Sequence, residues 1–307
     1  LRYSSDTYTM YQCIVSFITG LSTCCAKTTT APLERLKILF QAQNKHYKNM
    51  SVFGALKAIY KKEGTLGYYR GNGAMMVRVF PYGAIQFMCY EQYKTLFCDT
   101  LDYGHIGKMF AGGLAGLSAC TCTYPLDVVR SRLAFQVADE HRYCGICSTL
   151  RQICSTEGGV CALYRGFTPT GLSMIPAVGL GFYAFESFKD FIVSLHGTMT
   201  RVHPISGETV LTATGGLVCG ALSGASSQTV AYPLDVVRRR MQLAGSLADG
   251  HKYKTCISTF IAVYTEDGVR HGLYRGLSIN YLRVCPQIAV MFAVYEMTKQ
   301  VLHEQSS

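Results

Sequence analysis

The sequence predicts an all-α membrane protein in which six transmembrane helices form a pseudo-threefold bundle. Two observations lead to this fold class: three short motifs recur three times in the same order, and each recurrence carries two long segments with few charges. A third observation is the placement of proline, which follows the same threefold pattern. Each repeat is therefore expected to run as a helix, a loop with a short helix, and a second helix.

The three recurring motifs define the repeats. The first, Pro-x-Asp/Glu-x-x-Lys/Arg, starts at Pro32, Pro125 and Pro233, which are 93 (125 − 32) and 108 (233 − 125) residues apart. The second is an acidic-Gly pair followed by Tyr-Arg-Gly, and the third is an aromatic residue followed by Glu-x-x-Lys. The second and third motifs stand at 63–71, 157–166 and 267–276, and at 90–94, 185–189 and 295–299. Because internal repeats decide the architecture, we expect three repeat units at residues 1–103, 104–204 and 205–307.

Long segments with few charges predict the spanning helices. The first long helix of each repeat is expected at 10–42, 107–136 and 209–243, and the second at 73–98, 168–194 and 278–302. Spans of about 20 largely uncharged residues can cross a hydrocarbon core. Gly216, Gly220 and Gly224 have the spacing that lets helix backbones approach closely in a bilayer. Amphipathic short helices are expected near 51–62, 146–156 and 255–266, and short loops around Tyr103 and Val202.

Six of the eight prolines obey the threefold pattern. Pro32, Pro125 and Pro233 occupy equivalent sites in the first long helices. In the second long helices, a proline stands ten residues before the glutamate of the third motif. These prolines are Pro81, Pro176 and Pro286. Proline inside a helix removes a backbone hydrogen bond and kinks the helix, so matched kinks are expected to narrow the bundle at both ends.

Composition and charge favour a membrane protein with water-facing helix surfaces. The mean hydropathy of +0.16 is high for a soluble protein and low for a protein with many spans. The net charge is +10, and Lys and Arg recur in the segments between apolar spans, as the positive-inside rule describes for one side of a membrane. They are not gathered in one run and no nucleic-acid-binding module is visible. We therefore expect a lipid bilayer and no nucleic acid as a partner.

Acidic and basic residues stand three apart in the first and third motifs, on one face of a helix. Charges at the ends of spans usually face a polar interior, and threefold repetition lets each acid pair with the base of the neighbouring repeat. Two such sets at opposite ends of a bundle can act as two gates. The first ring is Glu34, Lys37, Asp127, Arg130, Asp235 and Arg238; the second ring is Glu91, Lys94, Glu186, Lys189, Glu296 and Lys299.

Two glutamines are candidates for hydrogen bonds that brace the first ring. Gln41 and Gln242 each lie nine residues after the motif proline of their repeat, at Pro32 and Pro233. The matching position of the second repeat is Ala134, so no brace is expected there.

The three motif sets resemble those of the mitochondrial carrier family over essentially the whole chain. The resemblance implies a six-helix carrier of the mitochondrial inner membrane that works by alternating access, with a matrix gate at the first ring and a cytoplasmic gate at the second. It also implies a monomer that is not an enzyme, and cardiolipin bound near Gly71–Gly73, Gly166 and Gly276, where helix N-termini suit phosphate. One departure is visible: Leu39 stands where the other repeats have Arg132 and Arg240.

Positions that break the threefold symmetry are candidates for substrate binding. Thirteen residues before the acid of each third motif stand Arg78, Ser173 and Arg283, and Lys27 lies five residues before Pro32. Lys27, Arg78 and Arg283 have no symmetry-related acids, and unpaired cations at midspan need an anionic partner. In the family's scheme of contact points, Arg78, Ser173-Met174 and Arg283 match the three points.

The three cations match those of the family's adenine-nucleotide carriers. However, the run Arg238-Arg239-Arg240-Met241-Gln242-Leu243 departs from the Arg-Arg-Arg-Met-Met-Met of ADP/ATP exchangers. Stretches such as 69–87 and 124–136 look most like members grouped with coenzyme A transporters. We therefore expect a carrier of coenzyme A or a related adenine nucleotide, exchanged by antiport; an ADP/ATP-type or other nucleotide exchanger is the alternative.

Fourteen cysteines do not form a disulfide framework, because several lie inside expected spans. Cys144 and Cys147 form a lone Cys-x-x-Cys, which is weak evidence for zinc without a second pair or nearby histidines. No metal is expected. Two hypotheses from other classes stay open: a redox-responsive membrane protein that uses Cys144 and Cys147, and a soluble helical repeat protein that binds nucleic acid.

Overall fold

Six long helices form the body of the protein. The computed structural model describes residues 2–47, 50–100, 104–137, 143–195, 200–202, 209–247 and 250–304. The first long helices of the repeats are α1 (Arg2–Gln41), α4 (Gly104–Phe135) and α7 (Ala213–Gln242), and the second are α3 (Asn72–Lys94), α6 (Phe167–Ser194) and α9 (Leu277–Glu304). The predicted helices are therefore confirmed. Their ends differ by four residues or fewer, except that α1 begins at Arg2, eight residues before the predicted start (10 − 2).

A short helix follows the first long helix of each repeat. These helices are α2 (Val52–Glu63), α5 (Ile146–Thr156) and α8 (Cys256–Gly268). A tight helical segment then leads into the second long helix; these segments are η1 (Thr65–Tyr69), η3 (Gly159–Tyr164) and η6 (Val269–Leu273). Further short segments are η2 (Thr95–Thr100), η4 (Ala244–Ser246) and η5 (Gly250–Lys252). The order helix, short helix, helix is thus confirmed in all three repeats.

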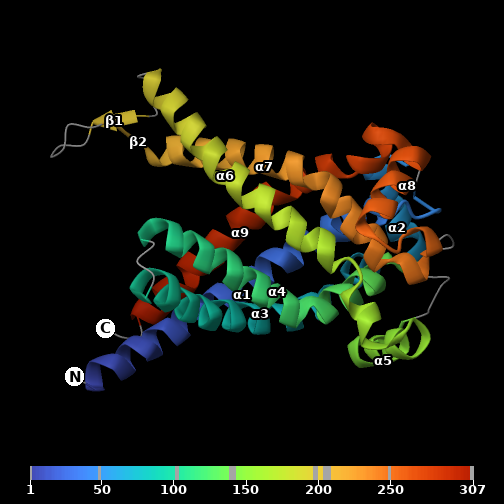
Figure 1. Cartoon of the computed structure of the whole chain (residues 1–307), viewed down its shortest axis with the longest axis horizontal. Coiled ribbons are helices and arrows are strands. Elements are labelled where there is room, and N and C mark those ends of the chain that lie inside the picture. Colours follow the sequence, from blue (N-terminus) through green and yellow to red (C-terminus); the bar gives the residue numbers. More distant parts are fainter. Residues whose placement is uncertain are drawn as a thin grey trace.

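The long helices close into a ring of pairs. The closest packing joins α3 with α4, α6 with α7, and α9 with α1, so the last repeat returns to the first. Both termini lie at one end of the bundle, at the left of Figure 1, and α2, α5 and α8 lie at the other end. This arrangement is the pseudo-threefold, all-α bundle that the repeats predict.

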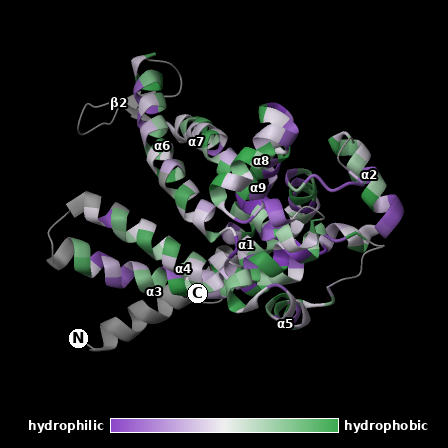
Figure 2. Cartoon of the chain, turned by 45° about the vertical axis from the view of Figure 1, so that its right-hand side comes forward, coloured by the Kyte–Doolittle hydropathy of each residue, from purple (hydrophilic) through white to green (hydrophobic). Residues whose placement is uncertain are grey.

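The packed core lies toward the end that carries the short helices. All six threefold-related prolines are inside the long helices. Just beyond the prolines of the first helices, Leu36, Val128 and Val236 are fully buried. Figure 2 shows hydrophilic ribbon around the labels α1 and α9, in the middle of the molecule where the helices converge. Polar residues are therefore enclosed at the narrow part of the bundle.

The link between α6 and α7 differs from the prediction. A short loop around Val202 was expected, but α6 ends at Ser194 and α7 begins at Ala213. Between them, β1 (Thr200–Val202) and β2 (Thr209–Leu211) pair antiparallel, with Thr200 opposite Leu211. Thr and Val are common in strands, and this hairpin lies apart from the bundle in Figure 1. The prediction of a short loop at Val202 is therefore wrong.

Among the described residues, one helical segment is apolar enough by length and composition to pass as a membrane span on its own, Leu277–Thr298 in α9. The other long helices do not pass this test, and several of them place charged side chains at the polar centre, such as Asp127 of α4 and Arg238 of α7. This is the pattern expected for helices with one face on lipid and one on water.

Candidate functional site

Two of the three predicted pairs of the first ring are formed. Arg130 of repeat 2 pairs with Glu34 of repeat 1. Arg238 of repeat 3 pairs with Asp127 of repeat 2, with 2.7 Å between Nη2 and Oδ2. Each acid thus contacts the base of the following repeat, as the threefold pattern predicts, and these pairs join neighbouring first helices at the narrow part of the bundle.

The third pair of the first ring is open. Lys37 Nζ donates to Asn280 Oδ1 at 2.9 Å and lies 5.4 Å from the centre of the Tyr232 ring. Asp235, which is half-buried, has no ion pair within the part of the chain that the structure describes. The first ring is therefore closed between repeats 1 and 2 and between repeats 2 and 3, but not between repeats 3 and 1.

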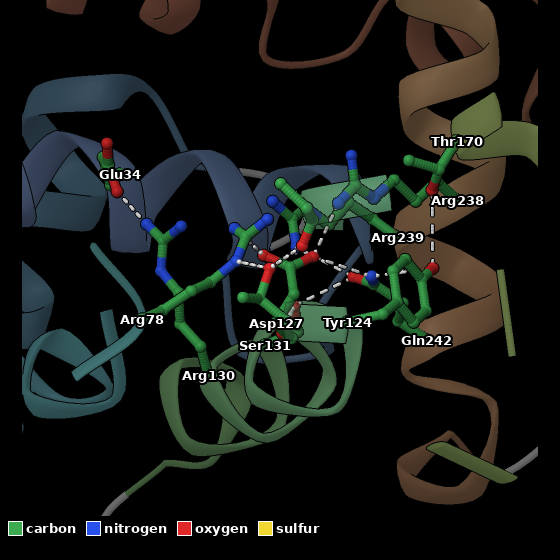
Figure 3. A network of polar contacts seen from close by, with 12 residues as sticks. Glu34, Arg78, Tyr124, Asp127, Arg130, Ser131, Thr170, Arg238, Arg239 and Gln242 are labelled. Carbon is green, nitrogen blue, oxygen red and sulfur yellow. Dashed lines mark hydrogen bonds and ion pairs between the residues drawn. The ribbon is translucent and has the colours of Figure 1, made fainter. Parts of the chain in front are cut away.

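Asp127 is the centre of the polar network, as Figure 3 shows. The residue is 1% exposed. Besides Arg238, its carboxylate contacts Arg78 Nη1 at 2.8 Å and Gln242 Nε2 at 2.9 Å, and Arg239 Nη1 lies 3.6 Å away. A buried carboxylate is stable only when it is paired and hydrogen-bonded, and Asp127 meets this condition through residues of α3 and α7.

The prediction that Arg78 and Arg283 have no acidic partner is wrong. Arg78 pairs with Asp127, and Arg283 Nη1 lies 2.7 Å from Glu34 Oε1. Sequence spacing alone missed these contacts because the kinked helices converge. A carboxylate has two oxygens and accepts two cations, so each of these acids holds one base of the first ring and one midspan arginine.

The repeat symmetry explains why the third acid lacks such a partner. By that symmetry, Asp235 would take its second cation from position 173, which is a serine. Ser173 is 7% exposed, and its hydroxyl donates to the Thr170 carbonyl at 2.9 Å. Met174 packs on the apolar cluster that contains Tyr124. The second contact point therefore offers no charge.

Of the three midspan cations, Lys27 is the one without an ion pair among the described residues. It lies within electrostatic reach of Arg78, Arg130 and Arg283 and of one acid, Asp127. No hydrogen bond or ion pair of its ammonium group occurs within the described residues. A half-buried ammonium group among three guanidinium groups favours the approach of an anion.

The charges around this centre do not balance. Seven basic side chains meet three carboxylates there, so basic groups outnumber acidic groups by four. The bases are Lys27, Lys37, Arg78, Arg130, Arg238, Arg239 and Arg283, and the acids are Glu34, Asp127 and Asp235. In a partly desolvated interior, this excess favours a ligand with several negative charges.

The two candidate brace residues behave differently. Gln242 is fully buried; its amide nitrogen donates to Asp127 and to the Tyr124 hydroxyl at 3.1 Å, and its oxygen accepts from Ser131 at 2.9 Å. Gln41 is equally buried, but neither its Oε1 nor its Nε2 has a hydrogen-bond partner among the described residues. Gln242 thus braces the closed side of the first ring, and Gln41 lies at the open side.

Among the residues that the structure describes, the second ring has no ion pair between repeats. Its one ion pair there joins Lys189 and Glu186 at 3.5 Å within α6, and both side chains are exposed. Glu91 and Glu296 are exposed and Lys94 is half-buried, and the Lys299 side chain lies outside the described residues. The described part of the second ring therefore does not link the repeats, while the first ring joins them at the other end.

Three further arginines, Arg35, Arg132 and Arg240, form ion pairs that the sequence interpretation did not predict. Arg132 lies 2.8 Å from Glu157, and Arg240 lies 2.8 Å from Asp267. Their Nε atoms donate to the carbonyls of Gln242 and Gln41 in the next repeat. We call these three arginines, with their acidic partners, the outer clamps.

In repeat 1 the clamp arginine is Arg35, not residue 39. Arg35 Nη1 lies 2.9 Å from Glu63, and its Nε donates to the Ala134 carbonyl at 3.1 Å. Arg35 is four residues before Leu39, which places it on the same helix face one turn away. The presence of an arginine four residues before Leu39 was the sequence signal that Arg35 replaces the arginine missing at position 39.

The outer clamp of repeat 3 includes a tyrosine outside the spanning helices. The Tyr253 hydroxyl accepts from Arg240 at 3.1 Å and donates to Glu266 at 3.4 Å. Burial raises the pKa of Tyr253, against the opposing effect of Arg240, so the hydroxyl keeps its proton at neutral pH.

The lone Cys-x-x-Cys gives no support to a metal or redox site. Cys144 and Cys147 are free and exposed. No group of three metal-binding side chains occurs in the part of the chain that the structure describes.

Comparisons with known proteins agree with this architecture. The family model described as "Mitochondrial carrier protein" matches residues 9–101, 102–195 and 210–306. The chain is similar to Solute carrier family 25 member 16 of Homo sapiens, with 50% identity over 288 residues, 92% of this chain and 86% of that protein. It is 40% identical over 287 residues to "Mitochondrial coenzyme A transporter SLC25A42" of Danio rerio, with 91% and 84% covered. It is also 37% identical to "Mitochondrial carrier protein CoAc1" of Arabidopsis thaliana, over 91% of this chain and 87% of that protein.

Proposed function

Because the chain belongs to the mitochondrial carrier family, we propose that it moves coenzyme A or a closely related adenine nucleotide. At the level of the family, the protein is a transporter and a multi-pass protein of the mitochondrial inner membrane. The proposal rests on the excess of positive charge at the narrow part of the bundle. There Lys27 lies near Arg78, Arg130 and Arg283 and has no ion pair among the described residues.

The chemistry of coenzyme A matches this excess. Its 3′-phosphate and diphosphate bring several negative charges. Arginine offers forked donors to phosphate and lysine a compact charge. Arg78 and Arg283 each hold a carboxylate through one Nη atom, so a phosphate can share or replace that carboxylate. The similarity to a relative named as a mitochondrial coenzyme A transporter supports the same substrate class.

Alternating access follows from the two rings. We propose that the first ring is the matrix gate and the second ring the cytoplasmic gate. The described state, with the first ring two-thirds closed and the second open, then faces the cytoplasm. The open pair Lys37 and Asp235 suits this role, since a gate must break during each cycle and a ring of three buried pairs would resist opening.

Two expectations from the family complete the proposal. We propose that the carrier works as a monomer. We also propose that cardiolipin binds at the N-terminal ends of α3, α6 and α9. Gly71, Gly166 and Gly276 stand there with positive φ angles of 81°, 85° and 87°, which leaves backbone donors open to a phosphate.

Replacing Lys27 with Ala is expected to narrow the preference for coenzyme A over AMP. A contact between a charged donor and a phosphate is worth about 1.5–3 kcal/mol, so the preference should fall by roughly tenfold or more. Competition by unlabelled coenzyme A and AMP against labelled substrate in liposomes measures it. Lys45→Ala, which removes an exposed lysine outside the bundle, is the matched control. An unchanged preference in Lys27→Ala would remove Lys27 from the binding site.

A further inference from the structure

The three short helices present different outward faces. Their equivalent positions follow from the acidic residue of each second motif, because Lys57, Arg151 and Ile261 each lie six residues before it, at Glu63, Glu157 and Asp267. Residues 59, 153 and 263 are fully buried in all three helices and hold them to the bundle. The outward faces can therefore be compared position by position.

The exposed apolar residues of α8 lie on a face without charge, and its exposed Glu266 is off that face. These residues, Ile257, Phe260, Ile261 and Tyr264, are 75%, 38%, 54% and 53% exposed. They recur at helical spacing and form one stripe; we call these four residues the α8 stripe. The equivalent face of α2 also exposes Phe53 and Tyr60, but at the position of Ile261 α2 has Lys57 and α5 has Arg151, and both are exposed.

The α8 stripe is followed along the chain by the helical segment that passes as a membrane span, Leu277–Thr298 of α9. After α8, Val269 is 49% exposed, and α9 begins at Leu277. Along α9, Leu282, Ile288 and Phe292 are exposed as well, within the segment Leu277–Thr298 that passes as a membrane span. Exposed apolar residues thus run from α8 into a helix that faces lipid.

We propose that the α8 stripe is embedded in the acyl-chain boundary of the bilayer, while α2 and α5 lie at the headgroup level. Amphipathic helices with aromatic and aliphatic residues on one face insert in this way. Lys254 and Arg270, exposed on either side of the stripe, suit the anionic headgroups beside it. Lys57 and Arg151 keep the other two helices in contact with water. The short helix of repeat 3 therefore anchors the carrier in the bilayer more deeply than the short helices of repeats 1 and 2.

The absence of tryptophan from this chain gives a direct test. Ile257→Trp, Cys147→Trp and Phe53→Trp each introduce one indole at equivalent exposed positions, ten residues before the acidic residue of each second motif, and leave Lys57 and Arg151 in place. The variants are reconstituted in vesicles of phosphatidylcholine and cardiolipin. Brominated acyl chains quench an indole in the hydrocarbon, and aqueous iodide quenches one in water. Ile261→Trp, on the same stripe, serves as a second probe should Ile257→Trp fail to fold.

The I257W carrier is expected to emit at shorter wavelength and to be quenched by brominated lipid severalfold more than the C147W and F53W carriers. Iodide should quench them in the opposite order. Equal quenching of I257W and C147W by iodide would overturn the proposal. Protection of I257W from both quenchers would overturn it too, because a protein, such as a second copy of the chain, would then cover the stripe.

Discussion

Replacing Asp127 with Ala is expected to destabilise the carrier strongly and to stop transport. The residue is 1% exposed. Its carboxylate pairs with Arg78 and Arg238 and accepts a hydrogen bond from Gln242, and Arg239 lies 3.6 Å away. Its loss leaves several buried cations without an acid. Removing one partner of a buried pair costs about 3–5 kcal/mol. Thermal unfolding of the purified carrier in detergent measures the loss.

Asp235→Ala is the matched control for this substitution. Asp235 is the symmetry-related acid of repeat 3, but it has no ion pair among the described residues. Its replacement is expected to lower the unfolding temperature much less than Asp127→Ala. An equal fall in unfolding temperature in the two variants would contradict this account, because it would mean that Asp235 is paired as strongly as Asp127. A charge swap of Asp127 and Arg238 is expected to restore only part of the activity, because Arg78 and Arg239 also contact Asp127.

Arg283→Ala and Arg78→Ala are expected to lower uptake of a phosphorylated substrate by roughly ten- to a hundredfold each, which corresponds to one lost charged hydrogen bond of about 1.5–3 kcal/mol. Each arginine lies at midspan beside Lys27. Uptake into liposomes measures the rate, and the rise in unfolding temperature on adding coenzyme A measures binding.

The stability of these variants separates binding from folding. Since Arg283 also pairs with Glu34 and Arg78 with Asp127, both variants should unfold at a somewhat lower temperature, yet Arg130 and Arg238 still hold the two acids. Lys108→Ala removes an exposed cation of α4 and should change neither quantity. If coenzyme A stabilises Arg283→Ala as much as the unaltered carrier, Arg283 does not bind the substrate.

The fold could be predicted almost fully because the same three motifs recur in each of the three repeats. Each helix was found from a motif that recurs, so an ambiguous segment in one repeat was decided by its counterparts. The error at Val202 arose where the repeats differ, since the chain between α6 and α7 forms β1 and β2. The equivalent link between repeats 1 and 2 is much shorter, since η2 ends at Thr100 and α4 begins at Gly104, so it was a poor guide to the link at Val202.

The sequence indicated which residues lie in the site, but it predicted only some of the ion pairs among them. Glu34–Arg130 and Asp127–Arg238 follow from the threefold pattern. The contacts of Arg78 and Arg283 depend on how far the kinked helices converge, which sequence spacing does not give. Arg35 shows the same limit, because it reaches the position of the missing arginine from one helical turn away.

The exchange of labelled coenzyme A by the purified carrier in liposomes tests the central claim most directly. The claim is that the excess of positive charge around Lys27, Arg78 and Arg283 binds a substrate with several phosphates. The predicted result is saturable uptake that unlabelled coenzyme A inhibits strongly, AMP weakly and pantetheine not at all. Inhibition by AMP and pantetheine as strong as that by coenzyme A would contradict it.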